Sequence, residues 1–480
     1  MLFNSLQFAL FFPFTTALFF LAPPRLRWLV LLVMSCVFYM AFVPAYILIL
    51  VVTIVVDYFA GLWIGRTEGP ARKVALILSI IVNVGFLAFF KYWAFLAVNA
   101  TELVHSLGGT WSVPTLSIVL PIGLSFHIFQ SLSYTIEVYR RAQKPERHFG
   151  IYALYVMFYP QLVAGPIERP QNLLHQFHEP KPFDPLRAAS GLQRMLWGFF
   201  KKVAVADRLA PMVDVVYRDP HAHTGLPLLA ATLAFSIEIY CDFSGYSDIA
   251  LGTAELMGFE LMENFDRPYF SGSIGEFWTR WHRSLSTWFR DYLYIPLGGS
   301  RAGELRWARN IVIVFAVSGL WHGANWTFVV WGLLHASFQL AGRLKNKLWK
   351  RPAEKQKTAI DLLRTFSLVT FAWIFFRARS LSDAGYIAAH LFQGLTAQLA
   401  SPRAAWVALR PLAHVQEMAT ALVLVAILLG IEALQARGGP LRPRLFQAPR
   451  WLRWGLCYAC LFTTILLGVY GHTAFIYFQF

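Results

Sequence analysis

The segment SGLWHGANWTFVVWGLLH, residues 318–335, places a histidine, His322, inside an apolar run of membrane-spanning length. An ionisable side chain at bilayer depth is costly, so such residues usually face a protein interior or a watery cavity and mark functional sites. Gly323 would let a backbone or a ligand come close. We therefore predict a site around His322, although a histidine merely bonded between packed helices fits its position equally well. Three neighbours could wall a cavity or supply hydrogen bonds: Trp321, Asn325 and Trp326.

The composition indicates a polytopic membrane protein. Of the 480 residues, 57% are hydrophobic and 14% are charged, against about 25% charged residues in ordinary soluble domains. Apolar runs that match the roughly 17–25 residues needed to cross a bilayer recur along the chain, and we expect ten to twelve spans. The net charge of +16 resides in short loops between these runs, which argues against nucleic-acid binding.

The basic loops predict an orientation in the membrane. Arginine and lysine follow the first, third and fifth apolar runs, at residues 23–27, 66–73 and 140–147, whereas the loop 99–112 contains neither. Because cytoplasmic loops are enriched in basic residues, the N-terminus is expected outside. The first apolar run lacks preceding basic residues and a clear cleavage site, so we interpret it as a retained span.

Polar residues within other apolar runs suggest contacts between helices. We interpret Asp57 and His127 in this way, and leave open a functional role for either. Residues 226–262 contain more acidic residues than a lipid-facing span would carry: Glu238, Asp242, Asp248 and Glu255. We expect these side chains to face inward or to lie near a membrane interface. The four cysteines lie in or beside apolar runs without further ligands, so we predict no metal site.

Two segments are unlike simple spans. Residues 159–177, YPQLVAGPIERPQNLLHQF, carry three prolines and a glycine. Non-helical backbone at membrane depth must be buried in protein or line a cavity, although an ordinary interfacial loop is the alternative. Residues 270–301 mix aromatic with charged residues, as interfacial helices do, and contain His282. Taken alone, His282 would be interpreted as a solvated surface histidine.

Five segments resemble, in this order, motifs of the membrane-bound O-acyltransferase family. They are PQLVAGPIERP (160–170), YCDFSGYSDIALG (240–252), NFDRPYFSGSIGEFWTRWHRSLSTWFRDYLYIPLGG (264–299), SGLWHGANWTFVVWGLLH (318–335) and FIYFQF (475–480). Within this family the chain resembles the bacterial membrane subunits that O-acetylate alginate and related exopolysaccharides or peptidoglycan. Teichoic acid D-alanyl transferases share the motifs but are usually shorter.

The resemblance implies an all-α polytopic fold of the bacterial inner membrane, with re-entrant and interfacial helices around a central funnel or tunnel. It implies a catalytic core over residues 1–380 and a C-terminal transmembrane extension over 381–480. It further implies that His322 is the catalytic histidine and His282 the second motif histidine. The motifs hold five further tunnel or donor-site candidates: Trp278, Asp291, Trp321, Asn325 and Trp326.

The reaction expected from the resemblance is transfer of an acetyl group from a cytoplasmic thioester to an outer hydroxyl. A neutral imidazole at His322 would remove the hydroxyl proton as the oxygen attacks the acyl group. The donor would be acetyl-CoA or another acyl thioester, without a bound cofactor. The acceptor would be an exopolysaccharide or a periplasmic or extracellular acetyltransferase partner, because the chain has no large external domain to hold a polymer.

Other functions remain open from the sequence. D-alanyl transfer to teichoic acid and peptidoglycan O-acetylation use the same motifs. A transporter without covalent chemistry would also fit apolar spans with buried acids.

Two details concern the substrates. The C-terminal segment is predicted on the outer side, where the phenol of Tyr477 could accept the acyl group and pass it on; a tail that only packs on the last span is the alternative. Lys201, Lys202 and the basic loop after Arg343 are candidates for binding a phosphorylated donor, unless they act only as topology signals.

Overall fold

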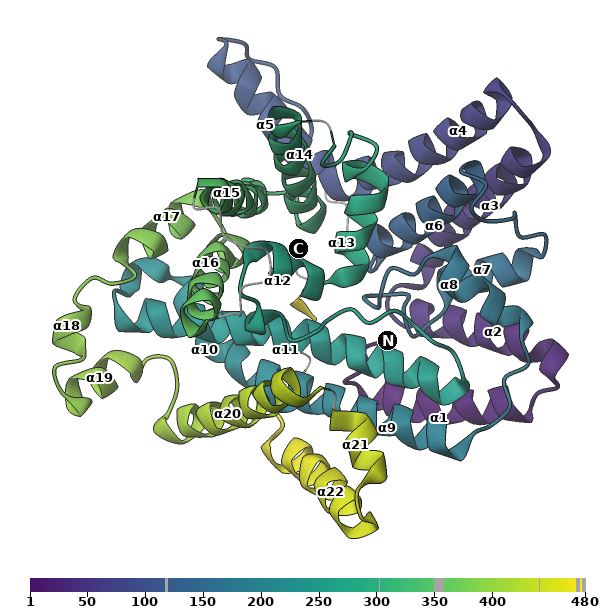
Figure 1. Cartoon of the computed structure of the whole chain (residues 1–480). Helices are drawn as coiled ribbons and strands as arrows, with labels where there is room; N and C mark the ends of the chain where they lie inside the picture. Colours follow the sequence, from purple (N-terminus) through teal and green to yellow (C-terminus); the bar gives the residue numbers. More distant parts are fainter. Residues whose placement is uncertain (117–119, 302, 349–357, 440, 472–474, 477–480) are drawn as a thin grey trace. The chain divides into compact units, whose positions relative to one another are not determined.

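The computed structural model describes residues 1–116, 120–301, 303–348, 358–439, 441–471 and 475–476. These residues form helices joined by turns and extended connections, which confirms the all-α membrane fold (Figure 1). Two compact units divide the chain: unit 1 is Met1–Met195 with Ile249–Met262, and unit 2 is Leu196–Asp248 with Glu263–Phe480. Tyr477 lies outside the described residues.

Unit 1 contains the N-terminal helices. They are α1 (Leu6–Leu21), α2 (Arg27–Met40), α3 (Ile47–Arg66), α4 (Pro70–Leu87), α5 (Trp93–Ser106), α6 (Leu124–Tyr139), α7 (Phe149–Met157) and α8 (Pro170–Leu173). Two helices, α9 (Pro185–Phe199) and α11 (Leu226–Met257), contribute residues to both units.

Unit 2 contains the remaining helices, and both candidate histidines belong to this unit. They are α10 (Asp207–Arg218), α12 (Ile274–Arg280), α13 (Arg283–Phe289), α14 (Glu304–His322), α15 (Trp326–Leu348), α16 (Ala359–Arg377), α17 (Leu381–His390), α18 (Leu395–Gln398), α19 (Pro402–Leu409), α20 (Val415–Gly438), α21 (Leu441–Gln447) and α22 (Arg450–Leu467). Two π-helical segments, η5 (Phe200–Ala206) and η8 (Arg290–Tyr294), adjoin α10 and α13.

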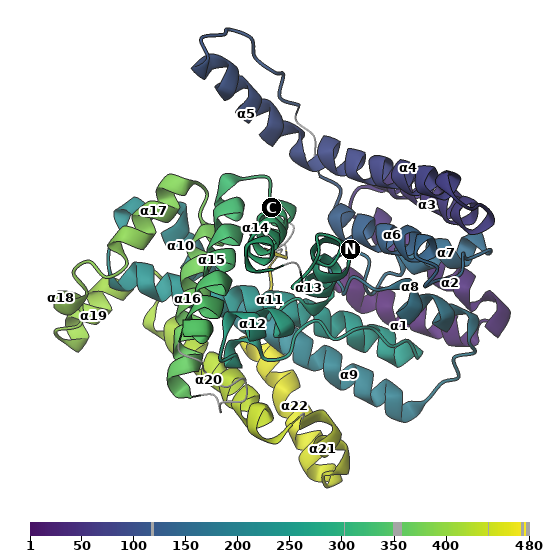
Figure 2. The ribbon, with the colours of Figure 1, turned by 45° about the horizontal axis from the view of Figure 1, so that its top comes forward.

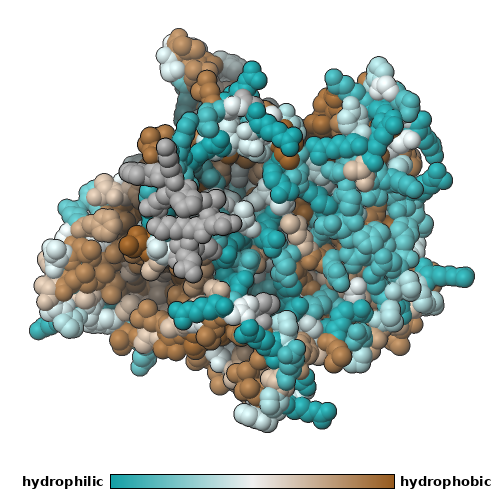
Figure 3. All heavy atoms as spheres, in the orientation of Figure 1, coloured by the Kyte–Doolittle hydropathy of each residue, from teal (hydrophilic) through white to brown (hydrophobic). Residues whose placement is uncertain are grey.

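Within the described part of the chain, five helical stretches are long and apolar enough to cross a membrane. They are Pro44–Arg66, Pro70–Ser106, Leu226–Met257, Ala359–Arg377 and Val415–Gly438. The sequence predicted ten to twelve spans; helices in the remaining predicted spans, such as the 16-residue α1, are shorter or less apolar. Figure 3 shows hydrophobic side chains over α20, which exposes Leu422, Val423 and Leu434 as a lipid-facing helix would.

Polar side chains join three helices of unit 1, α3, α4 and α6, which lie side by side (Figure 2). The carboxylate of Asp57 on α3 accepts hydrogen bonds from Ser79 (2.7 Å) and Asn83 (2.9 and 3.0 Å) on α4. His127 on α6 lies within hydrogen-bond distance of the Thr53 hydroxyl on α3. Asp57 and His127 therefore make the contacts between helices that the sequence predicted.

The proline-rich backbone between α7 and α8 is buried within unit 1. Phe158, Tyr159, Ala164 and Glu168 are each fully buried, and the Tyr155 hydroxyl donates to the Glu168 carbonyl oxygen at 2.8 Å. The interfacial-loop alternative is therefore wrong for this stretch. Its backbone groups avoid lipid because protein surrounds them.

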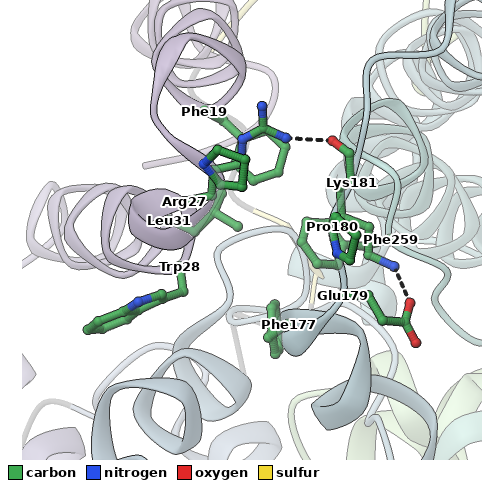
Figure 4. A pocket seen from close by; sticks show the side chains of 10 residues that line it. Phe19, Arg27, Trp28, Leu31, Phe177, Glu179, Pro180, Lys181 and Phe259 are labelled. Atoms are coloured by element: carbon green, nitrogen blue, oxygen red, sulfur yellow. Dashed lines mark hydrogen bonds and ion pairs between the residues drawn. The ribbon is translucent and has the colours of Figure 1, made fainter.

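A small pocket in unit 1 is lined by Arg27, Lys181 and aromatic side chains (Figure 4). The Arg27 guanidinium donates to the Lys181 carbonyl oxygen at 2.6 Å, and the Lys181 ammonium pairs with Glu179 at 2.8 Å. The Arg27 guanidinium thus joins the start of α2 to the segment after α8, whereas the Lys181 ammonium is paired within that segment.

Two glycines let α14 and α15 pack closely in unit 2. A Cβ at Gly319 would overlap the Phe328 carbonyl oxygen, and a Cβ at Gly332 would overlap the Phe315 carbonyl oxygen. Backbone on each helix therefore fills the space that a side chain on the other would need. This contact fixes the helical hairpin that carries His322.

We expect Gly332→Ala to lower the free energy of unfolding by about 1–3 kcal/mol, because the new methyl group forces the two helices apart. Thermal unfolding of the purified protein in detergent would measure the change. Gly342→Ala, on the same helix with open space around its Cα, is the matched control and should be neutral or stabilising. Equal stability of the two variants would contradict the close-packing argument.

Candidate active site

His322 is the last residue of α14 and is buried, with 4% of its surface exposed. Trp331 from α15 and Phe376 from α16 lie edge-on to its ring, at centroid distances of 5.0 and 5.4 Å. The sequence predicted that a backbone or a ligand comes close to Gly323. In the structure the Phe328 ring does so, and a Cβ at Gly323 would overlap it. The helix end is thus packed against two further helices.

His282 is held in a turn between α12 and α13. Its backbone is left-handed, with φ 42° and ψ 55°, a conformation that costs a non-glycine residue on the order of 1–2 kcal/mol. The residue is fully buried, so the interpretation as a solvated surface histidine is wrong. Burial lowers the pKa of the imidazole to about 3, and the ring is therefore neutral near pH 7.

The fold brings the two histidines together in a box of aromatic rings. The imidazoles of His282 and His322 have centroids 6.4 Å apart at an interplanar angle of 53°. Trp321 contacts both rings, at 6.1 Å from His282 and 5.0 Å from His322. Phe243 of α11 lies edge-on to His282 at 4.6 Å. The two buried imidazoles therefore form one candidate site.

The other predicted residues have different surroundings. The Trp278 indole donates to His335 at 3.3 Å and so lies in the aromatic layer around Trp331. Asn325 precedes α15; its side-chain oxygen accepts from the Thr327 amide at 3.0 Å, and its side-chain amide donates to the Arg379 carbonyl oxygen. Trp326 is half exposed, and Asp291 pairs with Arg290 at 2.8 Å in η8. Only Trp321 of these five is shown against both imidazoles among the described contacts.

Sequence reasoning missed His335 as part of this region. The buried His335 ring lies 5.1 Å from the Trp331 ring. Trp331 also contacts His322, so it lies against both histidines. The Trp278 hydrogen bond gives this imidazole a packing role. His335 lies in the same apolar run as His322, and a second histidine in that run could have indicated its burial near the site.

A buried charge cluster lies in the same unit. The Lys202 ammonium in η5 pairs with Asp207 at 2.8 Å and with Asp242 of α11, and all three residues are at most 5% exposed. Burial lowers the pKa of Lys202, but attraction to Asp242 and Asp207 outweighs it, so the pKa lies above its ordinary value and the amine stays charged. The prediction that Asp242 faces inward is confirmed.

The two lysines of η5 are therefore not an exposed phosphate site. Lys201 pairs with Asp248 at 2.5 Å and donates to Ser244 at 2.9 Å, and its side chain is 5% exposed. Both ammonium groups are used inside the protein, because a buried charge needs a partner of opposite sign.

The charge cluster also binds the end of the described chain. The Ile476 amide donates to the second oxygen of Asp242 at 2.9 Å. Phe475 is buried against Tyr246 and Phe243, at 4.9 and 5.5 Å. Phe243 in turn touches His282, so the tail is connected to the histidine site by a single ring.

Comparison with known proteins decides the family. The model of the MBOAT, membrane-bound O-acyltransferase family matches residues 141–381, which include both histidines and the proline-rich segment. The chain belongs to this family. It is accordingly an O-acyltransferase and a multi-pass membrane protein, and family membership sets aside the non-enzymatic transporter.

Relatives within the family act on different acceptors. The probable alginate O-acetylase AlgI of Azotobacter vinelandii is 41% identical over 398 residues, covering 82% of this chain and 78% of the relative. The peptidoglycan O-acetyltransferase of Helicobacter pylori is 35% identical, covering 75% and 72%. The teichoic acid D-alanyltransferase of Streptococcus thermophilus is 27% identical, covering 55% and 69%.

Replacing Lys202 tests the charge cluster. We expect Lys202→Met to lower the free energy of unfolding by about 3–5 kcal/mol, because two buried carboxylates lose their cation. The measurement is thermal unfolding in detergent together with membrane abundance. Lys73→Met, which removes an exposed ammonium, is the control and should leave stability unchanged. A Lys202→Met variant as stable as the control would show that the cluster is not ion-paired.

Proposed function

We propose that this MBOAT protein transfers an acetyl group from a cytoplasmic thioester, acetyl-CoA, to a hydroxyl of an exopolysaccharide on the outer side of the bacterial inner membrane. The observation that carries the proposal is the pairing of two buried imidazoles, His282 and His322, in one aromatic box. The alginate-like acceptor is supported by the 41% identity to an alginate O-acetylase. The catalytic core covers residues 1–380, and residues 381–480 extend it.

The proposed reaction uses His322 as the general base. The imidazole takes the proton of the acceptor hydroxyl while the hydroxyl oxygen forms a bond to the acyl carbon. The carbon–sulfur bond then breaks, and the thiolate recovers the proton from His322 and leaves as the thiol. Aromatic rings around His322 keep competing water away from the thioester.

His282 is proposed to bind the acyl carbonyl. A neutral imidazole has one N–H to donate and one nitrogen that accepts. Its low pKa, caused by burial, keeps it in that form at physiological pH. A hydrogen bond from His282 to the carbonyl oxygen would strengthen as negative charge develops there in the transition state.

The tail supports a role at the acceptor side. The Ile476 amide donates to Asp242, and Phe475 packs on Phe243, the ring that touches His282. Tyr477 is proposed to accept the acyl group on its phenol and pass it to the polymer or to an extracellular acetyltransferase partner.

The first test of the function is the His322→Ala variant. We expect the acetyl content of the cell-surface polysaccharide to fall to background, because no base remains to activate the hydroxyl. Acetate released by mild alkali from purified polysaccharide measures the content at matched membrane abundance. His127→Ala, which removes a buried imidazole from unit 1, should retain acetylation.

Either of two results would redirect this proposal. Unchanged acetylation in His322→Ala would show that His322 is not the base. Loss of acetyl groups from peptidoglycan in place of exopolysaccharide would keep the reaction and change the acceptor.

A second test concerns the relay. Tyr477→Phe should abolish acetyl transfer while acetyl-CoA still binds, because the phenol oxygen is the proposed acyl carrier. Binding of labelled acetyl-CoA to membranes and polysaccharide acetylation would be measured side by side. Tyr470→Phe is the matched control: its exposed phenol donates to the Thr464 carbonyl oxygen, and its loss should leave transfer intact. Normal transfer by Tyr477→Phe would remove the relay and leave a tail that packs.

A further inference from the structure

The turn at His282 has an unusual helix start. Helix α13 begins at Arg283, so His282 occupies the N-cap position, where a side-chain oxygen normally accepts the amide of the second or third helical residue. The His282 side chain makes no such cap. Its imidazole contacts Phe243, Trp321 and His322 instead.

Asn264 supplies the missing cap from another segment of unit 2. Its side-chain oxygen accepts from the Ser284 amide at 3.3 Å and from the Ser284 hydroxyl at 3.0 Å. Its backbone oxygen accepts from the Arg283 amide at 2.9 Å. The first two amides of α13 are therefore satisfied by Asn264, which is 1% exposed.

The same segment also brackets the other side of the turn. The Asp266 amide donates to the Arg280 carbonyl oxygen at 3.0 Å, two residues before His282. Asn264 is itself tied to α11, because its side-chain amide donates to the Ser247 hydroxyl at 3.4 Å. Hydrogen bonds thus hold the chain before and after the left-handed residue.

We propose that Asn264 is a positioning residue for His282: it caps α13 in place of the histidine, so that the left-handed turn persists and the imidazole stays directed at His322. This proposal rests on the proposed function, in which His282 binds the acyl carbonyl. A left-handed non-glycine residue lasts only where its surroundings over-determine it. Without the cap, the turn relaxes and the imidazole leaves its place.

The decisive variant is Asn264→Ala. Turnover should fall about 10- to 100-fold, because a small displacement of a reacting group has that effect, while the KM for acetyl-CoA changes less than about twofold. The assay is the initial rate of thiol release from acetyl-CoA by membranes that contain matched amounts of the full chain. If Asn264→Ala does not accumulate, Asn264→Ser replaces it, since its side chain is too short for the Ser284 amide.

Two further variants separate positioning from general stability. Asn310→Ala removes another buried asparagine, whose amide donates to the carbonyl oxygens of Leu297 and Gly299, and it should keep near-normal turnover. Asn264→Asp keeps an acceptor for the amides at the start of α13, where negative charge is favoured, and should recover most of the lost turnover.

The outcomes distinguish the two proposals when His282→Ala is measured alongside. If His282→Ala is inactive but Asn264→Ala loses no more turnover than Asn310→Ala, the positioning role of Asn264 is overturned alone. A rise in KM without loss of turnover, or no recovery in Asn264→Asp, also overturns it. Full turnover by His282→Ala overturns the role of His282 in the proposed function, and with it any need to position that ring.

Discussion

The close packing of α14 against α15 is the constraint on which the candidate site depends. At Gly319 and Gly332 the backbone of each helix occupies the volume of a missing side chain on the other. Interiors packed this densely resist deformation, so the two helices of the hairpin hold each other in place. His322 at the end of α14 and Trp331 on α15 are consequently held edge-on at 5.0 Å. The His322 imidazole is therefore oriented by packed helices, with Trp331 of α15 and Phe376 of α16 against its ring.

The second histidine reaches the same place by a different physical route. His282 sits in a short, strained turn, so its position depends on hydrogen bonds from the segment around Asn264. A strained residue at a site is pre-organised when its surroundings hold it. One imidazole is thus fixed by helix packing and the other by a cap supplied from elsewhere in the chain. Trp321, which contacts both rings, connects the two arrangements.

Buried ion pairs hold further segments of unit 2 together. An unpaired ammonium or carboxylate inside an apolar protein is strongly unfavourable, so Lys202 requires Asp207 and Asp242 beside it. Asp242 then has an oxygen that accepts the Ile476 amide, which draws the last described residues to the rings next to His282. The cluster therefore links the η5 segment, α11 and the tail. In unit 1, Asp57 is satisfied instead by the neutral donors of Ser79 and Asn83.

The sequence by itself determined the membrane class. It also favoured a buried course for the proline-rich segment and contacts between helices for Asp57, and it restricted Asp242 to the protein interior or a membrane interface. These follow from composition, because the cost of placing polar groups in an apolar environment applies wherever they occur. The pairing of Lys202 with Asp242, forty residues away, was decided only by the tertiary structure. The tertiary structure also decided that His282 is buried. It placed Trp321 against both imidazoles and left Trp326 half exposed. These features depend on contacts between segments that are distant in the sequence, and a local sequence pattern does not predict such contacts.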